Sequence, residues 1–369
     1  MQLICRLNHT LAAAAFLAFI LPQVATSAAA VDLDRYRRPE VRLVPILPPP
    51  LIPEPLVGAI VLPPVVPPPM APSPVPPSFP VGPDFSLKGE TLPGATSQLL
   101  LVADKPLPGA ILPHKRIVAY YGNPMSRRMG VLGECSKDEL LCRLKAEAGR
   151  WAAADPSVEV QPALHLIAVV AQDSPGRAGK YRKLMTDALV SEVYGWAKEG
   201  GALLFIDIQT GHEDIRTILP RFEWILKNPD VHLGIDPEFN LVGSDAIPGT
   251  RVGSYDAVDV NAVSAWLADL VERYRLPPKV LTVHRFTQKG VTNADDIVLR
   301  PQVQIVMHMD GWGSPALKRA TYRDYVASEP VQFTGFKLFF HNDTKRGDPL
   351  MTPADVLRLQ PKPMYIQYQ

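Results

Sequence analysis

The sequence has 369 residues, of which 47% are hydrophobic, so the chain is long enough to bury a full-sized core. Its 38 basic and 37 acidic residues leave a formal net charge of +1. A balance this even gives no general reason to expect nucleic-acid binding, and no nucleic-acid partner is predicted. Proline is abundant, with 40 residues, and it is unevenly spread along the chain.

Residues 1–30 have the pattern of a secretory signal peptide. Arg6 gives a weakly positive start, an apolar run follows over 11–21, and alanines at 28–30 offer a cleavage site. The run is shorter than the roughly 20 residues that span a bilayer. We therefore expect a secreted or cell-envelope protein, periplasmic or extracellular. The alternative is an uncleaved segment that associates the N-terminus with the membrane.

Residues 31–113 form a proline-rich stretch with triple prolines at 48–50 and 67–69. Proline fixes φ and lacks the N–H that sheets and helix interiors require. The stretch is therefore predicted to be an extended, polyproline-like linker, which suits a tether between the cell envelope and a folded domain.

Residues 114–369 are predicted to form that folded domain. Short runs of β-branched and aromatic residues alternate there with helical patterns; the runs are 116–122, 162–171, 202–209, 231–239, 280–286, 303–310, 333–341 and 364–368. Alternating strands and helices indicate a parallel sheet in an α/β fold. Eight such units predict a closed (β/α)8 barrel of the TIM type. An open doubly wound sheet is the alternative, and no Gly-x-Gly-x-x-Gly follows the first strand to favour it.

Two cysteines, Cys135 and Cys142, remain after removal of the signal peptide. Cys142 lies on a predicted helix that starts with a capping box at Ser136, and Cys135 precedes that cap. Because the chain can bend back before the cap and exported proteins meet an oxidising compartment, a Cys135–Cys142 disulfide is predicted. Two separate buried thiols are the alternative.

Almost every predicted strand ends in polar side chains. In order these are Tyr121 and Asn123, His165 and Gln172, Asp207 and Gln209, Asp236 and Glu238, His284 and Arg285, His308 and Asp310, Lys337 and His341, and Gln367. In a (β/α)8 barrel the active site lies at the carboxyl ends of the strands. A barrel with only a structural role would not need this ring, so the ring is the predicted site.

The alternation of side chains along a strand sharpens this prediction. Asp236 and Glu238 share a face with Gly234, whereas His284 and Arg285 point in opposite directions, so one of the two leaves the site. His165 comes early in its strand, and a core histidine is the favoured interpretation for it.

Paired carboxyl groups suit glycoside hydrolysis, in which one acid protonates the leaving oxygen and another attacks or stabilises. Glu238 is the predicted acid, and Asp236 is expected to raise its proton affinity by like charge. Asp207 and Asp310 complete the predicted catalytic carboxylates. The predicted substrate-binding residues are Tyr121, Gln209, His284, His308, Trp312, Lys337, His341 and Gln367. Trp312 lies between two glycines, where it either stacks on a sugar or fills a gap.

The segment Asp236-Pro237-Glu238 resembles the Asp-x-Glu that ends strand four in the chitinase-like family of glycoside hydrolases. That resemblance implies that Glu238 is the acid and that Asp236 assists a substrate acetamido group. The earlier acidic positions of that family's strand are Gly234 and Val231 here.

Over a longer range the domain resembles a group of uncharacterised secreted bacterial barrel proteins, the hypothetical lipoproteins. The resembling segments are 163–172, 203–209, 231–239, 279–286 and 333–340. This resemblance implies a fold and a location and no reaction.

The principal interpretation is thus a secreted, glycoside-hydrolase-like barrel that acts on a carbohydrate or cell-envelope polymer without a metal or other cofactor. One alternative is a tethered module that binds a glycan or small ligand without catalysis. Another is a metal-dependent hydrolase that uses His284, His308, His341, Asp207 and Asp310 as ligands. Strand one reads Ala119-Tyr120-Tyr121 and lacks the His-x-His of many barrel metallohydrolases.

Overall fold

The computed structural model describes residues 107–369. The predicted signal peptide and the proline-rich linker up to residue 106 lie outside the described residues. Within 107–369, no helix combines the length and apolar character needed to cross a bilayer.

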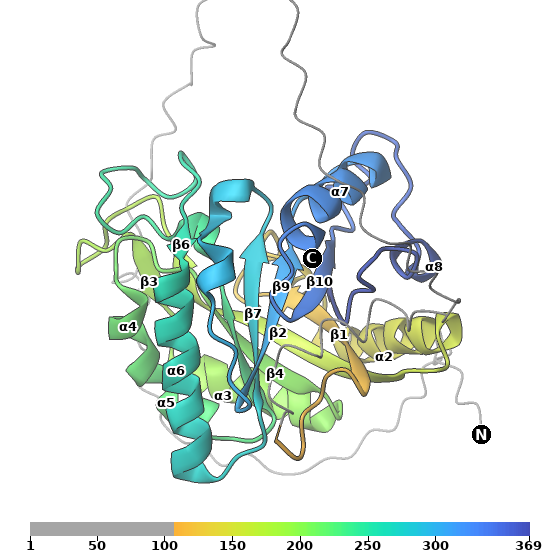
Figure 1. The fold of residues 1–369 in the computed structure, drawn as a ribbon, viewed down its shortest axis with the longest axis horizontal. Helices are drawn as coiled ribbons and strands as arrows, with labels where there is room; N and C mark the ends of the chain where they lie inside the picture. Colours follow the sequence, from red (N-terminus) through yellow and green to blue (C-terminus); the bar gives the residue numbers. More distant parts are fainter. Residues whose placement is uncertain (1–106) are drawn as a thin grey trace, which may run out of the picture. The chain divides into compact units, whose positions relative to one another are not determined.

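The described chain forms a closed barrel of eight parallel strands (Figure 1). The strands are β1 (Lys115–Gly122), β2 (Glu159–Ala171), β4 (Leu203–Ile208), β5 (Val231–Ile235), β7 (Lys279–Arg285), β9 (Val303–Met309), β10 (Phe333–Leu338) and β11 (Tyr365–Tyr368). Each pairs with the next along the chain, and β11 pairs with β1 to close the ring. The predicted (β/α)8 fold is confirmed.

Two small additions decorate the barrel. Strand β3 (Arg182–Leu184) pairs antiparallel with β2, and β6 (Tyr255–Asp256) pairs with β8 (Val291–Thr292). Both lie in connections that follow barrel strands, so they add structure around the end of the barrel where the carboxyl ends of the strands emerge.

Helices connect the strands and cover the outside of the barrel. They are α2 (Lys137–Ala154), α3 (Asp187–Glu199), α4 (Ile215–Ile218), α5 (Glu223–Leu226), α6 (Ala257–Tyr274), α7 (Pro315–Tyr322) and α8 (Pro353–Val356). Short 3-10 turns occur at η2 (Val131–Gly133), η3 (Leu219–Phe222), η4 (Pro237–Phe239), η5 (Gln288–Gly290) and η6 (Ala294–Asp296), and η7 (Arg323–Ala327) is a π-helical turn. The predicted cap of α2 is present, because the Ser136 side chain accepts a hydrogen bond from the Glu139 N–H.

The amino-terminal end of the barrel is filled by apolar side chains. Leu112, Ile117, Phe205, Val306 and Tyr365 belong to this inner cluster, and all are buried. The N–H groups of Ile111 and Leu112 each donate to Gln304 Oε1 at 3.0 Å. The residues just before β1 therefore cover this end of the barrel.

The predicted disulfide is wrong in this structure, because Cys135 and Cys142 are not joined. Cys135 is half-buried and packs against the core just before the α2 cap, whereas Cys142 lies on an exposed part of α2. The helix begins too soon after Cys135 for the two side chains to turn toward each other.

Strand β5 is shorter than the sequence predicted and ends at Ile235 rather than at 239. Pro237 has no N–H to continue the ladder, so the chain turns into η4. Asp236 caps this turn by accepting from the Glu238 N–H at 3.2 Å. Strand β10 likewise ends at Leu338, three residues before His341.

Candidate functional site

Above the apolar side chains that fill its amino-terminal end, the inside of the barrel holds a layer of buried polar side chains. It includes His165, Asp207, His284, His308 and Gln367. They come from β2, β4, β7, β9 and β11, and they alternate with residues that face the helices, as the strand pattern predicted. Arg285 is the residue of its pair that leaves the site, because its guanidinium bonds to Glu329 and to loop carbonyls.

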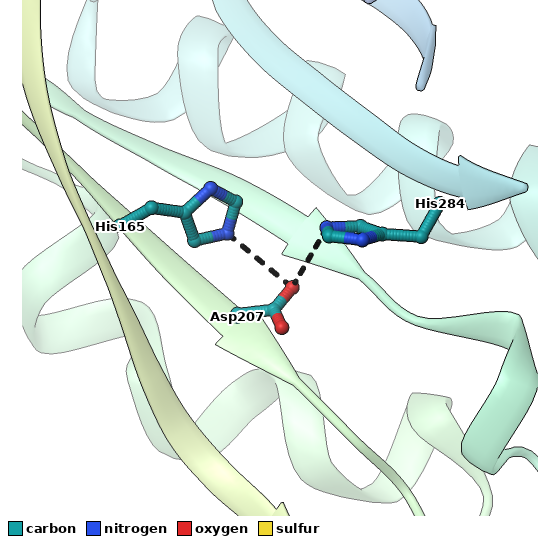
Figure 2. Close-up of side chains that lie close together, drawn as sticks. All are labelled: His165, Asp207 and His284. Atoms are coloured by element: carbon teal, nitrogen blue, oxygen red, sulfur yellow. Dashed lines mark ion pairs between the residues drawn. The ribbon is translucent and has the colours of Figure 1, made fainter. Parts of the chain in front are cut away.

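Asp207 lies at the centre of this layer. The Tyr121 hydroxyl donates to Asp207 Oδ2 at 2.7 Å, while Asp207 Oδ1 lies 3.3 Å from His165 Nε2 and 3.7 Å from His284 Nε2. Figure 2 shows the two histidines pointing at this one carboxylate oxygen from opposite sides. His165 is fully buried, as expected for a core histidine, and it is also part of the polar cluster around Asp207.

Asp310 forms a second buried charge cluster. Its Oδ1 contacts Lys337 Nζ at 2.9 Å, and its Oδ2 contacts His284 Nδ1 at 2.6 Å. Burial alone would raise the pKa of Asp310, but Lys337 and His284 outweigh burial and hold it well below its usual range. The same contact, together with Asp207, raises the pKa of His284 despite its burial.

An open pocket of about 700 Å³ lies over these clusters at the carboxyl ends of the strands. Seven of the predicted site residues line it: Tyr121, Gln209, Asp236, Glu238, Asp310, Trp312 and Lys337. Residues that the sequence did not single out also line it, including Met129, Phe286, Tyr325 and Phe339. Phe286 and Phe339 directly follow strands, and this position alone would have marked them as candidates.

Glu238 lies in η4 at the pocket wall, and its pKa is raised to about 7. Burial is the main cause, and the charge of Asp310 adds to it, while Lys337 and His284 act in the opposite direction. The expected shift is therefore present, but its cause differs from the predicted one. The charge of Asp310 raises the pKa of Glu238, and the charge of Glu238 in turn contributes to the raised pKa of Asp236.

Asp236 is more deeply buried than Glu238, with only 3% of its surface exposed. Burial raises its pKa well above the usual range, and His284 only partly offsets the effects of burial and of the carboxylates Asp207, Asp310 and Glu238. The pocket therefore contains two carboxyl groups that favour the protonated form beside one that favours the ionised form.

Trp312 stands at the pocket rim with 51% of its surface exposed. Its loop is fixed from below by Lys318 of α7, which donates to the Gly311 carbonyl at 2.7 Å and pairs with Asp343 at 2.9 Å. Asp343 also accepts from the Gly313 N–H at 2.9 Å. A buried ion pair thus holds an exposed indole in place.

Five predicted residues lie outside the pocket lining. Four of them lie below it, buried in the polar layer: Asp207, His284, His308 and Gln367. His341 lies apart, with 76% of its side chain exposed and its Nε2 2.9 Å from Glu134 Oε1. Because β10 ends at Leu338, strand alternation does not carry His341 inward.

Two glycines make room for the polar layer. Gly234 pairs with Asp207 across β4 and β5, and Gly335 pairs with His308 across β9 and β10. A Cβ on residue 234 would lie 2.5 Å from both Asp207 Oδ1 and His165 Nε2, and one on residue 335 would lie 2.5 Å from His308 Nδ1. Only glycine fits at either place while the polar side chains keep their positions.

We expect Gly234→Ala to destabilise the fold by about 1–3 kcal/mol, because the new methyl group must displace Asp207 and His165. Urea denaturation measures this change. Gly195→Ala is the matched control: Gly195 lies in α3 with no atom near its Cβ position, so alanine there should stabilise by about 0.5–1 kcal/mol. A neutral or stabilising Gly234→Ala would contradict the tight packing of this layer.

Two groups of side chains bring possible metal-ligand atoms within 4.8 Å of one another, namely His165–Asp207–His284 and Asp236–His284–Asp310. They share His284, whose two ring nitrogens face different aspartates.

Comparisons with known proteins show no family for this chain. No family model matches the chain, and no curated protein matches it. Similar solved structures include a 2,3-dimethylmalate lyase of the PEP mutase/isocitrate lyase superfamily, with a TM-score of 0.34, 10% identity, and coverage of 69% of this chain and 76% of that one.

They also include a trimodular GH5_4 endoglucanase, with a TM-score of 0.38, 8% identity, and coverage of 69% and 56% of the two chains. A putative alpha-L-fucosidase from Bacteroides thetaiotaomicron has a TM-score of 0.35, 9% identity, and coverage of 71% and 91%. The strand order itself establishes the fold of this chain, and at these scores the neighbours carry no information about its chemistry.

Proposed function

We propose that this chain is a glycoside hydrolase that acts on a carbohydrate polymer at or outside the cell envelope. One observation carries the proposal. A single pocket holds Glu238, whose pKa of about 7 leaves it partly protonated at neutral pH, and Asp310, which Lys337 and His284 keep ionised. Two carboxyl groups driven to opposite protonation states are what acid-assisted cleavage of a glycosidic bond requires.

Glu238 takes the role of general acid. It is the less buried of the two protonated carboxyl groups and lines the pocket, so it can reach a leaving oxygen. Its proton passes to that oxygen as the glycosidic bond breaks. A pKa near the working pH makes the proton both present and transferable.

Asp310 supplies the negative charge in this scheme. As the bond breaks, positive charge develops on the sugar ring, and a fixed carboxylate stabilises it or attacks it. The contacts with Lys337 and His284 hold the group in one orientation, which lowers the cost of reorganising the site during the reaction.

Asp236 remains a hydrogen-bond donor beside the acid, because its burial favours the protonated form. The resemblance of Asp236-Pro237-Glu238 to the chitinase-like Asp-x-Glu suggests an acetamido group as the acceptor. The aromatic side chains Tyr121, Phe286 and Trp312 supply apolar surface around a sugar ring. Acetamido sugars are therefore the first substrates to test, and the predicted export signal and linker place them at the envelope.

A panel of acetamido and neutral oligosaccharides, assayed for new reducing ends by mass spectrometry, tests the proposal. We expect cleavage of at least one acetamido glycan, with turnover lost when the pocket is blocked by Gln209→Trp. Binding of glycans by calorimetry with no cleavage across the panel would favour a non-catalytic binding module and contradict the proposal.

The pH dependence follows from the Glu238 pKa of about 7. The acid must be protonated to work, so kcat should fall as the pH rises through about 7.

The stability of the fold should also fall with rising pH. The pKa of Glu238 is higher in the folded chain than in the unfolded chain. The contribution of Glu238 to stability is therefore fully present below the unfolded pKa and is lost as the pH rises through about 7. Between pH 5 and pH 8 the free energy of unfolding should therefore decrease by about 1–3 kcal/mol less in Glu238→Gln than in wild type, as measured by denaturation. An equal pH dependence in wild type and variant would contradict the shift.

A further inference from the structure

We propose that His165, Asp207 and His284 bind one divalent transition-metal ion of the zinc type, in the polar layer just beneath the pocket. All three side chains are buried, and they come from β2, β4 and β7. Figure 2 shows the arrangement, with His165 Nε2 and His284 Nε2 both directed at Asp207 Oδ1. This site adjoins the pair Glu238 and Asp310 that carries the proposed hydrolysis, because His284 Nδ1 also contacts Asp310 Oδ2 at 2.6 Å.

The two distances from Asp207 Oδ1 to the histidine nitrogens fit a shared ion better than they fit strong hydrogen bonds. Asp207 Oδ1 lies 3.3 Å from His165 Nε2 and 3.7 Å from His284 Nε2, and the three atoms lie within 4.8 Å of one another. Zinc holds nitrogen and oxygen ligands at about 2.0–2.2 Å in a tetrahedron, which separates neighbouring ligand atoms by roughly 3.3–3.6 Å. The observed contacts fall at or near this separation and beyond the usual length of a strong ionic hydrogen bond.

Each proposed ligand is oriented by a second contact on its other side. His284 Nδ1 contacts Asp310 Oδ2 at 2.6 Å, His165 Nδ1 contacts the Tyr365 hydroxyl at 2.6 Å, and Asp207 Oδ2 accepts from Tyr121 at 2.7 Å. Metal-binding histidines commonly donate their other ring N–H to a carboxylate or another oxygen. These contacts leave both Nε2 atoms and one carboxylate oxygen to face each other.

Those three inward-facing atoms are buried and have no hydrogen-bond partner among the described residues. His232 shows why convergence matters: its Nε2 is also buried and unpaired, but among the described residues it belongs to no group of three converging ligand atoms. A single unpaired nitrogen occurs without a ligand, whereas three unpaired atoms aimed at one point would be costly to bury with nothing between them.

The β5 backbone lies close to two of the proposed ligand atoms. A Cβ on residue 234 would lie 2.5 Å from both Asp207 Oδ1 and His165 Nε2. Glycine at this position therefore lets the two side chains keep the positions in which their ligand atoms face each other. His308 also has two unpaired ring nitrogens and its ring centroid lies 5.0 Å from that of His284, but it belongs to neither group of converging ligand atoms.

The second group, Asp236–His284–Asp310, is a poorer cation site. Lys337 Nζ already contacts Asp310 Oδ1 at 2.9 Å, and His284 Nδ1 contacts Asp310 Oδ2. An ion there would compete with both contacts, and the positive charge of the Lys337 ammonium would repel it. The ion beneath the pocket would instead fix His284, and through it the orientation of Asp310.

Metal binding is tested with the exported chain, free of any purification tag. The protein is unfolded with a chelator, refolded, and titrated with Zn²⁺ alone and Co²⁺ alone. We expect one ion per chain by elemental analysis, a visible Co²⁺ spectrum of four- or five-coordinate type, and a rise in melting temperature with Zn²⁺. Absence of a stoichiometric ion in folded wild-type protein would overturn the proposal, since a proton on His284 would then satisfy Asp207.

Variants assign the ion to these residues. Asp207→Asn should abolish stoichiometric binding, and Tyr121→Phe, which keeps all three ligands, should weaken it about 10- to 100-fold. His232→Gln, a change to a buried histidine outside the cluster, should leave the stoichiometry at one. If Asp207→Asn does not fold, the Tyr121→Phe titration still tests whether the ion is bound by these three residues. Unchanged affinity in Tyr121→Phe, or an ion retained in folded Asp207→Asn, would contradict the assignment. Because these readouts need no substrate, they are independent of whether the chain cleaves glycans.

Discussion

Replacing Glu238 with glutamine is expected to lower kcat on a cleaved glycan by about 10²–10⁴-fold while substrate binding changes little. Glutamine keeps the shape of the side chain and its hydrogen bonding but has no acidic proton to transfer. Because the group lies in an open pocket and its charged form is disfavoured, the variant should fold at least as well as wild type. Steady-state kinetics and calorimetric binding to the same glycan measure the two effects separately.

Glu192→Gln is the matched control for this experiment. Glu192 is exposed on α3, far along the chain from the pocket residues, so the same chemical change there should leave kcat unaltered. Cleavage by Glu238→Gln at the wild-type rate would show that Glu238 is not the acid. Asp236 would then be the remaining protonated carboxyl group in the pocket to test.

Replacing Lys318 with methionine should destabilise the fold by about 3–5 kcal/mol, because it leaves Asp343 buried without its cationic partner. Methionine retains most of the apolar stem, so the effect reports the charge and not a cavity. The same change releases the Gly311 carbonyl, and the loop carrying Trp312 should lose its fixed position. Denaturant unfolding measures the loss of stability. The fluorescence of Trp312 measures the change in the loop, and it is obtained by subtracting the spectrum of the same protein carrying Trp312→Phe.

Arg319→Met provides the control, one residue further along α7 on its exposed side. A surface change of this kind should alter stability by less than about 0.5 kcal/mol. Equal effects of the two substitutions would mean that the Lys318–Asp343 pair does not anchor the loop.

The barrel was predictable because each of its strands carries its own local signal. Runs such as 116–122 and 303–310 are β-branched and bounded by turns, and the structure places strands Lys115–Gly122 and Val303–Met309 there. The error at β5 came from extending alternation through Pro237, whose missing N–H ends the ladder. The same overextension of β10 brought His341 into the predicted site.

The site was predictable in outline, because polar residues at strand ends converge whenever a barrel closes. The depth of each residue within the site and its contacts there could not be predicted from the sequence. Strand alternation shows that Asp207 and His165 face inward, but the depth of each depends on the register and tilt of neighbouring strands, as in the pairing of Asp207 with Gly234. The cause of the Glu238 shift likewise depends on Asp310, which is far away in sequence.

The most direct test of the proposed chemistry is a carboxyl-carbon NMR titration of the chain labelled at its glutamate side chains. It requires no substrate and reports the protonation state of Glu238 itself. We predict one glutamate resonance that titrates near pH 7 and disappears in Glu238→Gln, while most other glutamates titrate near pH 4–5. A Glu238 resonance that titrates with the ordinary glutamates would contradict the assignment of Glu238 as the acid.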